Sequence, residues 1–162
     1  MTIVGYIPAR TGSKRLKNKN FKSFFKGLSI TEIALKKSME SKILQFTLLD
    51  TNNKTFLENM KSKGLTDYFR LRKEEFSRDE SLTKDSMIDC ISKAEIDLDI
   101  KIDTIVLLQP TSPLISSNSI ELIIDKFFEN KTDLIASFTN VPVCINDCIK
   151  ISNNKINKIN LN

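Results

Sequence analysis

Apolar positions along the chain fall into blocks whose spacing alternates between that of a strand and that of a helix. Residues 2–8 form an apolar run that predicts a buried strand. Ser29-Ile30-Thr31-Glu32 then has the S-x-x-E form of a capping box, which predicts a helix running to about Ser41. A second apolar run predicts a strand over residues 43–49. The chain therefore begins with a strand, a helix and a second strand.

The alternation continues through the middle of the chain. Asn53 is suited to cap a short helix, and Gly64 is suited to end it. The apolar face of this helix is expected to consist of Phe56, Leu57 and Met60. An extended stretch is expected near residues 68–71, followed by a charged segment over residues 72–84.

Two longer helices are predicted after the charged segment, each with one apolar stripe that we expect to face the core. The first covers about residues 82–95, and its stripe consists of Met87, Ile88, Ile91 and Ala94. The second covers about residues 118–130, and its buried face consists of Ile120, Ile123, Ile124, Phe127 and Phe128.

The remaining extended segments complete the predicted fold. The continuous apolar run at residues 103–108 predicts a central strand that is buried on both faces of a parallel sheet. Residues 134–138 predict another strand, and alternation over residues 148–161 predicts a small hairpin around Asn153-Asn154. These elements predict an α/β fold with a doubly wound, mainly parallel sheet of about five strands, in a single domain over residues 1–162.

Charge is distributed unevenly along this pattern. The first 31 residues contain seven Lys and Arg and no Asp or Glu, which leaves 18 basic against 20 acidic residues in the remainder of the chain. The formal net charge of +5 therefore comes from these first 31 residues and creates a local positive field there. The basic residues follow the first strand in a small polar loop, residues 9–15, and a strand that opens into such a loop is typical of phosphate binding.

Composition excludes several kinds of chemistry. The chain contains no His, which excludes Ser-His-Asp and Cys-His catalysis and histidine-ligated metals. Cys144 and Cys148 lack the CxxC spacing, so a structural zinc site is not favoured. Three cysteines are too few for a disulfide scaffold, no apolar run approaches a membrane span, and no secretion signal is apparent. These features predict a cytoplasmic location and no membrane partner.

The loop after the predicted central strand is the second place where a ligand is expected. Gln109-Pro110-Thr111-Ser112-Pro113-Leu114 contains two prolines, which end regular structure and stiffen the loop. From these patterns alone we expect an anionic, phosphorylated ligand to bind between the Arg10 loop and the Gln109 loop.

The segments IPARTGSKRLKNKN and LLQPTSPL, at these same two strand ends, resemble the acylneuraminate cytidylyltransferases, or CMP-sialic acid synthetases. The resemblance extends from Ile3 to the tail. It implies a Rossmann-like three-layer fold of the nucleotide-diphospho-sugar transferase type. It also implies transfer of CMP from CTP to a nine-carbon acidic sugar, of the sialic, legionaminic or pseudaminic acid type, with release of pyrophosphate. Such products serve the synthesis of surface glycans, as in lipopolysaccharide or capsule.

The resemblance also implies roles for individual residues. Arg10, Lys14 and Lys19 are the expected catalytic residues, because fixed positive charge stabilises nucleotidyl transfer without proton transfer. The residues expected to bind the nucleotide are Ala9, Arg10, Gly12, Ser13, Lys14, Asn20, Arg72 and Thr83. Those expected to bind the sugar are Gln109, Thr111 and Ser112. In the family pattern Lys73 replaces a proline, and Asp50-Thr51-Asn52 replaces S-T-D.

Family members typically continue through a dimerisation arm and a late acidic motif that binds the catalytic magnesium. This chain carries neither, so Mg²⁺ is implied by the resemblance without any ligand being identified, and the usual homodimer is uncertain. Three hypotheses follow: a sugar cytidylyltransferase, a catalytically incomplete CTP-binding domain, and a basic nucleic-acid-binding module. The third depends on the basic block and on Phe21, Phe24 and Phe25, which interleave with lysines as stacking platforms would but are equally suited to packing beneath a loop.

Overall fold

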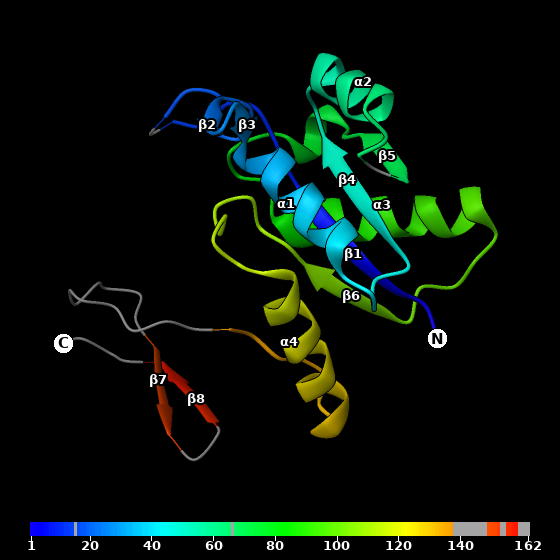
Figure 1. Ribbon diagram of the computed structural model, residues 1–162, viewed down its shortest axis with the longest axis vertical. Helices are drawn as coiled ribbons and strands as arrows, with labels where there is room; N and C mark the ends of the chain where they lie inside the picture. The colour runs from blue at the N-terminus through cyan, green and yellow to red at the C-terminus, as the bar shows by residue number, and fades with distance from the viewer. Residues whose placement is uncertain (15, 66, 138–148, 153–154, 159–162) are drawn as a thin grey trace.

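The centre of the molecule is a parallel sheet. The computed structural model describes residues 1–14, 16–65, 67–137, 149–152 and 155–158. Within them, four parallel strands form a sheet of order β5-β4-β1-β6 (Figure 1). These strands are β1 (Ile3–Pro8), β4 (Phe46–Thr51), β5 (Tyr68–Leu71) and β6 (Thr104–Leu107). The α/β fold with a mainly parallel sheet that the sequence predicts is confirmed.

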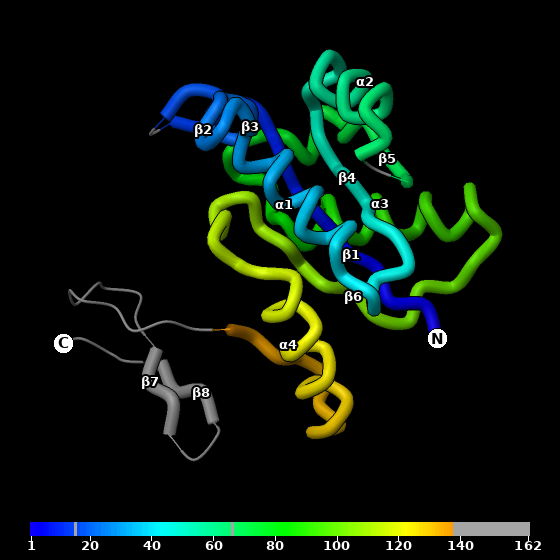
Figure 2. Tube along the Cα trace, viewed as in Figure 1, coloured from blue at the N-terminus to red at the C-terminus, as the bar shows by residue number. Residues whose placement is uncertain are grey.

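Helices cover both faces of this sheet. They are α1 (Ile30–Glu40), α2 (Lys54–Ser62), α3 (Thr83–Leu98) and α4 (Ser117–Glu129), with a short 3₁₀ turn η1 (Glu74–Phe76) before α3. In Figure 1, α1 crosses in front of the sheet and α3 lies behind it. The tube in Figure 2 shows α4 continuing from the loop after β6. No helix in the described part of the chain has the length and apolar character needed to cross a membrane.

Alternate residues of β1 serve the two cores of this layered structure. Ile3 and Ile7 belong to the larger core with buried residues of α1, α2 and α4. Val4 and Tyr6 belong to a smaller core with Cys90 of α3. Since successive strand residues point to opposite faces, β1 is buried on both sides, as the run at residues 2–8 predicts.

The predicted helix starts are confirmed in atomic detail. Ser29 caps α1: its Oγ accepts from the Glu32 backbone N–H at 3.2 Å, and its own N–H donates to the Glu32 carboxylate at 2.8 Å. This is the reciprocal capping box that the sequence predicts. Asn53 caps α2, with Oδ1 accepting from the Phe56 N–H at 3.0 Å.

A small antiparallel hairpin before α1 is absent from the sequence prediction. It consists of β2 (Ser23–Phe25) and β3 (Leu28–Ser29). Lys26 and Gly27 connect the strands with φ of 49° and 78°. Two consecutive positive φ angles are typical of a type I′ turn, and a glycine in the second position is the available signal for it.

The strand over residues 103–108 differs from its prediction. β6 lies at the edge of the described sheet and not at its centre, with β1 as its neighbour. Ile105 and Leu107 are 37% and 43% exposed. A continuous apolar run does not specify how many neighbours a strand has, and among the described residues the predicted central strand, buried on both faces, was wrong.

The strand predicted over residues 134–138 does not form in its described part, residues 134–137, and residue 138 lies outside the described residues. The Thr132 hydroxyl donates to the Leu134 carbonyl at 2.9 Å and accepts from the Leu134 N–H at 3.3 Å. This local bonding uses the Leu134 N–H and carbonyl, which a strand would use for its ladder bonds. The described sheet therefore has four strands, fewer than the expected five.

Two residues predicted to face the core lie instead on the exposed side of their helices, so these two predictions were wrong. Ile88 of α3 is 51% exposed, and Phe128 of α4 is 38% exposed. The face that α3 buries consists of Ser86, Cys90 and Ala94, one residue every helical turn. Apolar character alone placed Ile88 in the core, whereas the small polar Ser86 occupies the buried position.

The predicted tail hairpin is confirmed in its two strands. β7 (Ile149–Ser152) pairs antiparallel with β8 (Lys155–Lys158), and Ile151 lies opposite Ile156. Asn153 and Asn154, expected at its turn, lie outside the described residues, as do Cys144 and Cys148.

Candidate active site

A hollow of about 480 Å³ opens at the carboxyl ends of the parallel strands. It lies where the loops after β1, β5 and β6 converge, which is the usual ligand position in open α/β sheets. Its lining is polar and basic. The lining residues are Pro8, Arg10, Ser13, Lys14, Leu16, Lys19, Asn20, Arg72, Phe76, Asp79, Ser81, Leu82, Thr83, Gln109, Pro110 and Thr111.

The loop after β1 is held in place by hydrogen bonds to β4 and to the residues just after it. The Ala9 N–H donates to the Asp50 carbonyl at 2.9 Å. Asn52 makes two bonds to Thr11: its Oδ1 accepts from the Thr11 N–H, and its Nδ2 donates to the Thr11 hydroxyl, both at 2.8 Å. An amide performs this double role because it contains both a donor and an acceptor, which a carboxylate does not.

Two further residues give this loop its shape. Gly12 has φ of 79°, a conformation that side chains disfavour, so its contribution is to the turn. Asn20 is buried, and its Nδ2 donates to the Arg10 carbonyl at 3.0 Å. The Asn20 carbonyl in turn accepts from the Thr31 hydroxyl at 2.7 Å. These bonds link the basic loop to the start of α1.

Arg10 and Lys14 are both paired with one carboxylate across the hollow. Arg10 Nη2 lies 2.9 Å from Asp79 Oδ1, and Lys14 Nζ lies 2.7 Å from Asp79 Oδ2. The hydrogen bond from Lys14, and then that from Arg10, lower the pKa of Asp79. The same bond to Asp79 raises the pKa of Lys14. Lys19 also lines the hollow, half-buried and with no ion pair to any residue in the described part of the chain.

Arg72 also lines the hollow and belongs to a buried polar network. Its Nε donates to Asp50 Oδ2 at 2.9 Å, and its Nη2 donates to the Asp50 carbonyl at 3.2 Å. Asp50 also accepts from the Tyr6 hydroxyl at 2.6 Å and from the Ser86 hydroxyl. Burial, and then the charge of Asp50, raise the pKa of Tyr6, which keeps this phenol protonated as a donor.

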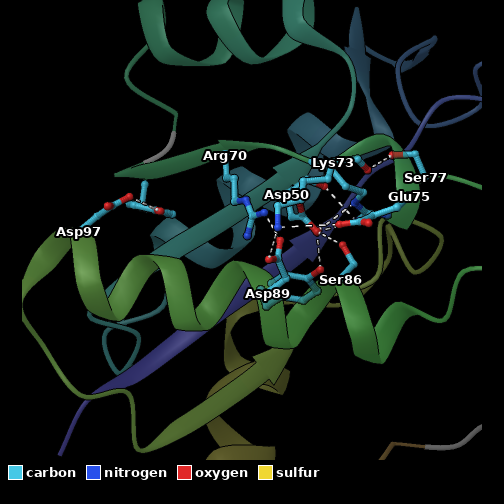
Figure 3. A network of polar contacts seen from close by, with 11 residues as sticks. Asp50, Arg70, Lys73, Glu75, Ser77, Ser86, Asp89 and Asp97 are labelled. Carbon is cyan, nitrogen blue, oxygen red and sulfur yellow. Dashed lines mark hydrogen bonds and ion pairs between the residues drawn. The ribbon is translucent and has the colours of Figure 1, made fainter.

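A second ion-pair group adjoins this network and fixes the segment after β5. Asp89 of α3 pairs with Arg70 of β5 and with Lys73, the latter at 3.0 Å. Figure 3 shows Asp50 and Ser86 meeting between β4 and α3, with Arg70 and Asp89 beside them. Lys73, which replaces the family's proline, therefore ties the Arg72 segment to α3.

The loop after β6 forms another wall of the hollow. Gln109 and Thr111 line it, and both side chains are exposed. The Thr111 hydroxyl lies 3.4 Å from Gln109 Oε1. Pro110 between them is buried, so the loop presents two exposed polar side chains on a stiff support.

The structure brings most of the predicted site residues to this one hollow. Those that line it are Arg10, Ser13, Lys14, Lys19, Asn20, Arg72, Thr83, Gln109 and Thr111. Three predicted residues do not: Ala9 is fully buried, Gly12 shapes the turn, and Ser112 lies against a different hollow beside β6. Asp50, Asn52 and Ser86 were not among the predicted site residues. Asp50 had a signal, as a carboxylate inside the apolar segment FTLLDT, and Asp50-Thr51-Asn52 stood out as a departure from S-T-D, whereas Ser86 had no signal.

The described residues do not form a metal site by themselves. No group of three or more His, Cys, Asp or Glu gathers anywhere in the part of the chain that the structure describes. Asp79 is the one carboxylate among the residues that line the hollow, and both of its oxygens are paired with cations. The donor set therefore does not fit a magnesium ion held by protein ligands alone.

One observation bears on the nucleic-acid hypothesis. Phe21 packs against Phe56, with ring centroids 4.8 Å apart, and joins the larger core. Phe24 and Phe25 are 61% and 58% exposed in the β2–β3 hairpin. One of the three rings that this hypothesis used as stacking platforms is therefore part of the core.

Comparison with known proteins identifies an α/β domain of the nucleotidyltransferase class. A family model described as cytidylyltransferase matches residues 4–161. The chain is also 31% identical, over 113 residues, to the CMP-N,N'-diacetyllegionaminic acid synthase of Legionella pneumophila. The aligned segment covers 70% of this chain and 47% of that protein. The chain belongs to the cytidylyltransferase family.

Solved structures share its fold. A CMP:2-keto-3-deoxy-manno-octonic acid synthetase complexed with CTP matches with a TM-score of 0.66 at 17% identity, over 81% of this chain and 49% of that one. A cytidylyltransferase from Leptospira borgpetersenii matches with a TM-score of 0.56 at 24% identity, over 81% of this chain and 50% of that one. The chain spans about half the length of these relatives.

Proposed function

We propose that this protein transfers CMP from CTP to an acidic nine-carbon sugar of the sialic, legionaminic or pseudaminic acid type. The observation that carries the proposal is the gathering of Arg10, Lys14, Lys19 and Arg72 around one hollow at the carboxyl ends of the strands. Fixed positive charge at such a position suits a triphosphate. The legionaminic acid synthase is the relative that supports this class of acceptor.

In the proposed reaction, a sugar hydroxyl oxygen forms a bond to the α-phosphorus of CTP. The bond from that phosphorus to the oxygen bridging to the β-phosphorus breaks, and pyrophosphate leaves with the electron pair. Negative charge builds up on the phosphate oxygens during this step, so the cations of the hollow stabilise the transition state more than the ground state. The chain has no His, and we assign the hydroxyl proton to water.

The residues that line the hollow suit the two substrates. The basic loop and Arg72 carry the positive charge of the hollow, and we assign the triphosphate to them. Thr83 begins α3, and Leu82 before it supplies no capping side chain, so the amino end of this helix adds positive character to the hollow. Gln109 and Thr111 also line it, and their neutral hydrogen-bonding groups suit the hydroxyls of a sugar.

Mg²⁺ is the cofactor that we propose, entering together with the nucleotide phosphates, which is the usual mode for this ion. The described residues supply no protein ligand set for it.

The test is pyrophosphate release from CTP and Mg²⁺ with a panel of sialic, legionaminic and pseudaminic acids. We expect release with one of these sugars, and a loss on the order of 100-fold in Lys14→Ala, because one fixed charge at the reacting phosphates is removed. Lys17→Ala is the matched control, since Lys17 is exposed in the same basic block and does not line the hollow. It should retain full activity.

Calorimetric titration with CTP in the same samples separates the hypotheses. CTP binding without pyrophosphate release from any sugar would favour the catalytically incomplete CTP-binding domain. Absence of CTP binding would contradict both that hypothesis and the proposed function.

A further inference from the structure

Asp79 lies between Arg10 and Lys14, the two cations to which we assign the triphosphate. Each carboxylate oxygen serves a different partner, Oδ1 accepting from Arg10 at 2.9 Å and Oδ2 facing Lys14 at 2.7 Å. A phosphate group held by the same two side chains would use two oxygens in the same way. The carboxylate is therefore arranged as a phosphate would be.

The segment that carries Asp79 is suited to move. Asp79 lies in a turn between η1 and α3, outside regular structure, and its side chain is 34% exposed. Arg10 and Lys14 are its side-chain partners in the described part of the chain. Ser81, Leu82 and Thr83, which follow, also line the hollow. Displacement of Asp79 therefore changes one wall of the site.

The pairing affects how strongly the site attracts anions. With Asp79 in place, the two cations and the carboxylate have a net charge of +1, and with Asp79 displaced the cations have a charge of +2. A triphosphate gains contacts with both cations only after it has broken both ion pairs. Exposed ion pairs of this kind are weak, so a polyanion that also reaches Lys19 and Arg72 outcompetes the carboxylate.

We propose that Asp79 is an internal competitor for the phosphates, which holds Arg10 and Lys14 in the free protein and is displaced when a triphosphate binds. This inference rests on the proposed function. The carboxylate weakens binding of the triphosphate. It also assists departure of the pyrophosphate product, because Asp79 re-forms its ion pairs as the product leaves. Asp79 thereby sets the affinity of the site for polyphosphates.

The experiment compares wild type with Asp79→Asn by calorimetric titration of CTP, inorganic tripolyphosphate and cytidine. We expect Asp79→Asn to bind CTP and tripolyphosphate about 3- to 10-fold more tightly, the equivalent of two weak exposed ion pairs that no longer have to be broken. Cytidine has no phosphate, so its affinity should not change. Pyrophosphate should become a stronger product inhibitor by a similar factor.

Two control variants make the comparison specific. Glu80→Gln removes the same charge one residue away, from a side chain that lines no part of the hollow, and should change affinity by about 2-fold or less. Asp79→Glu retains a competing carboxylate and should keep an affinity close to that of wild type. Thermal unfolding of each variant verifies that the fold is intact.

The outcomes distinguish this inference from the proposed function. Equal tripolyphosphate affinity in wild type and Asp79→Asn, or no tripolyphosphate binding by either protein, would overturn the inference. A gain of equal size in Glu80→Gln would also overturn it, by attributing the effect to net charge. Tighter tripolyphosphate binding by Asp79→Asn in a protein that releases no pyrophosphate from CTP with any sugar would support the inference and contradict the proposed function.

Discussion

At the scale of single residues, the contact between Asp50 and Arg72 has the largest consequences. Both side chains are nearly inaccessible, at 1% and 5% exposure, and Arg72 nevertheless lines the hollow. The guanidinium can be buried against Asp50 and also line the hollow because it has several donors in a fixed planar arrangement. Two of them hold Asp50 while the group still faces the site. The pair therefore links the stability of the sheet to the shape of the site.

We predict that Arg72→Ala lowers the free energy of unfolding by about 3 kcal/mol, because it leaves a buried carboxylate without its cation. This value is at the lower end for such a change, since Tyr6 and Ser86 still donate to Asp50. Urea denaturation measures the loss. Lys73→Ala removes the next cation along the chain, whose side chain is 55% exposed and pairs with Asp89, and should cost about 1 kcal/mol or less. Equal losses in the two variants would contradict the prediction.

At the scale of elements, the start of α1 depends on a charged group. The Glu32 carboxylate accepts from Ser29 and, at 2.8 Å, from Lys63 beyond the end of α2, so one side chain caps one helix and ties it to another. Burial favours a higher pKa for Glu32, but the bonds from Lys63 and Ser29 outweigh burial and lower it. A lowered pKa in the folded protein means that the ionised form contributes stability above the ordinary value of 4.5, and that this contribution is lost as the pH falls through the lowered pKa.

We predict that Glu32→Gln reduces the free energy of unfolding by about 1 kcal/mol at neutral pH, through loss of a charge-assisted cap. The difference from wild type should shrink as the pH falls below 4.5. Chemical denaturation at a series of pH values measures it. Glu40→Gln, on the same helix and paired with Lys37 at the surface, is the control and should have a smaller effect. A difference that persisted unchanged in acid would contradict the charge-based explanation.

The elements also show which features of this fold the sequence predicts. The starts of α1 and α2 were correct because their signals are local: a serine or asparagine whose side chain reaches a backbone N–H three residues on. The edge position of β6 and the loss of the strand at residues 134–137 depend on which segments become neighbours, and no local pattern contains that information. The Lys26-Gly27 turn had a local signal that the predicted pattern did not include.

The same contrast between local signals and long-range contacts holds for the residues of the site. The two loops that face the hollow were predicted as the binding site of an anionic ligand from their residue types and their position after strands, and the resemblance to the cytidylyltransferases added Arg72, Thr83 and the sugar. The supporting residues were not predicted, because Asp50, Asn52 and Ser86 act through contacts between residues 36 or 41 positions apart in the chain. Asn52 was noted only as a departure from S-T-D, and its two hydrogen bonds to Thr11 give that departure a structural role.

At the scale of the whole molecule, Cys90 reports on global unfolding. It is fully buried between α3 and the sheet, and burial, followed by the charge of Asp50, raises the pKa of its thiol to about 12. The folded protein therefore retains the thiol proton where the unfolded chain, with an ordinary pKa of 9.0, loses it. The stability that this group contributes is complete below pH 9 and is lost as the pH rises toward 12.

We predict that iodoacetamide labels Cys90 only through unfolding, so that the labelling rate at neutral pH rises with urea in parallel with the unfolded fraction. A variant with both Cys144→Ser and Cys148→Ser isolates the signal. Cys90→Ala in that background is the control for non-specific labelling. Rapid labelling of Cys90 in the absence of urea would contradict the burial on which the prediction depends.

The ion pairs of Asp79 have a practical consequence for anyone who crystallises this protein. Sulfate and phosphate are common precipitants, and at molar concentration either anion competes with a single carboxylate for Arg10 and Lys14. Crystals grown from such salts should show an anion between these two side chains and Asp79 turned away. Crystals grown from polyethylene glycol in chloride should preserve the closed pairing. The choice of precipitant would thus select which form of the site is observed.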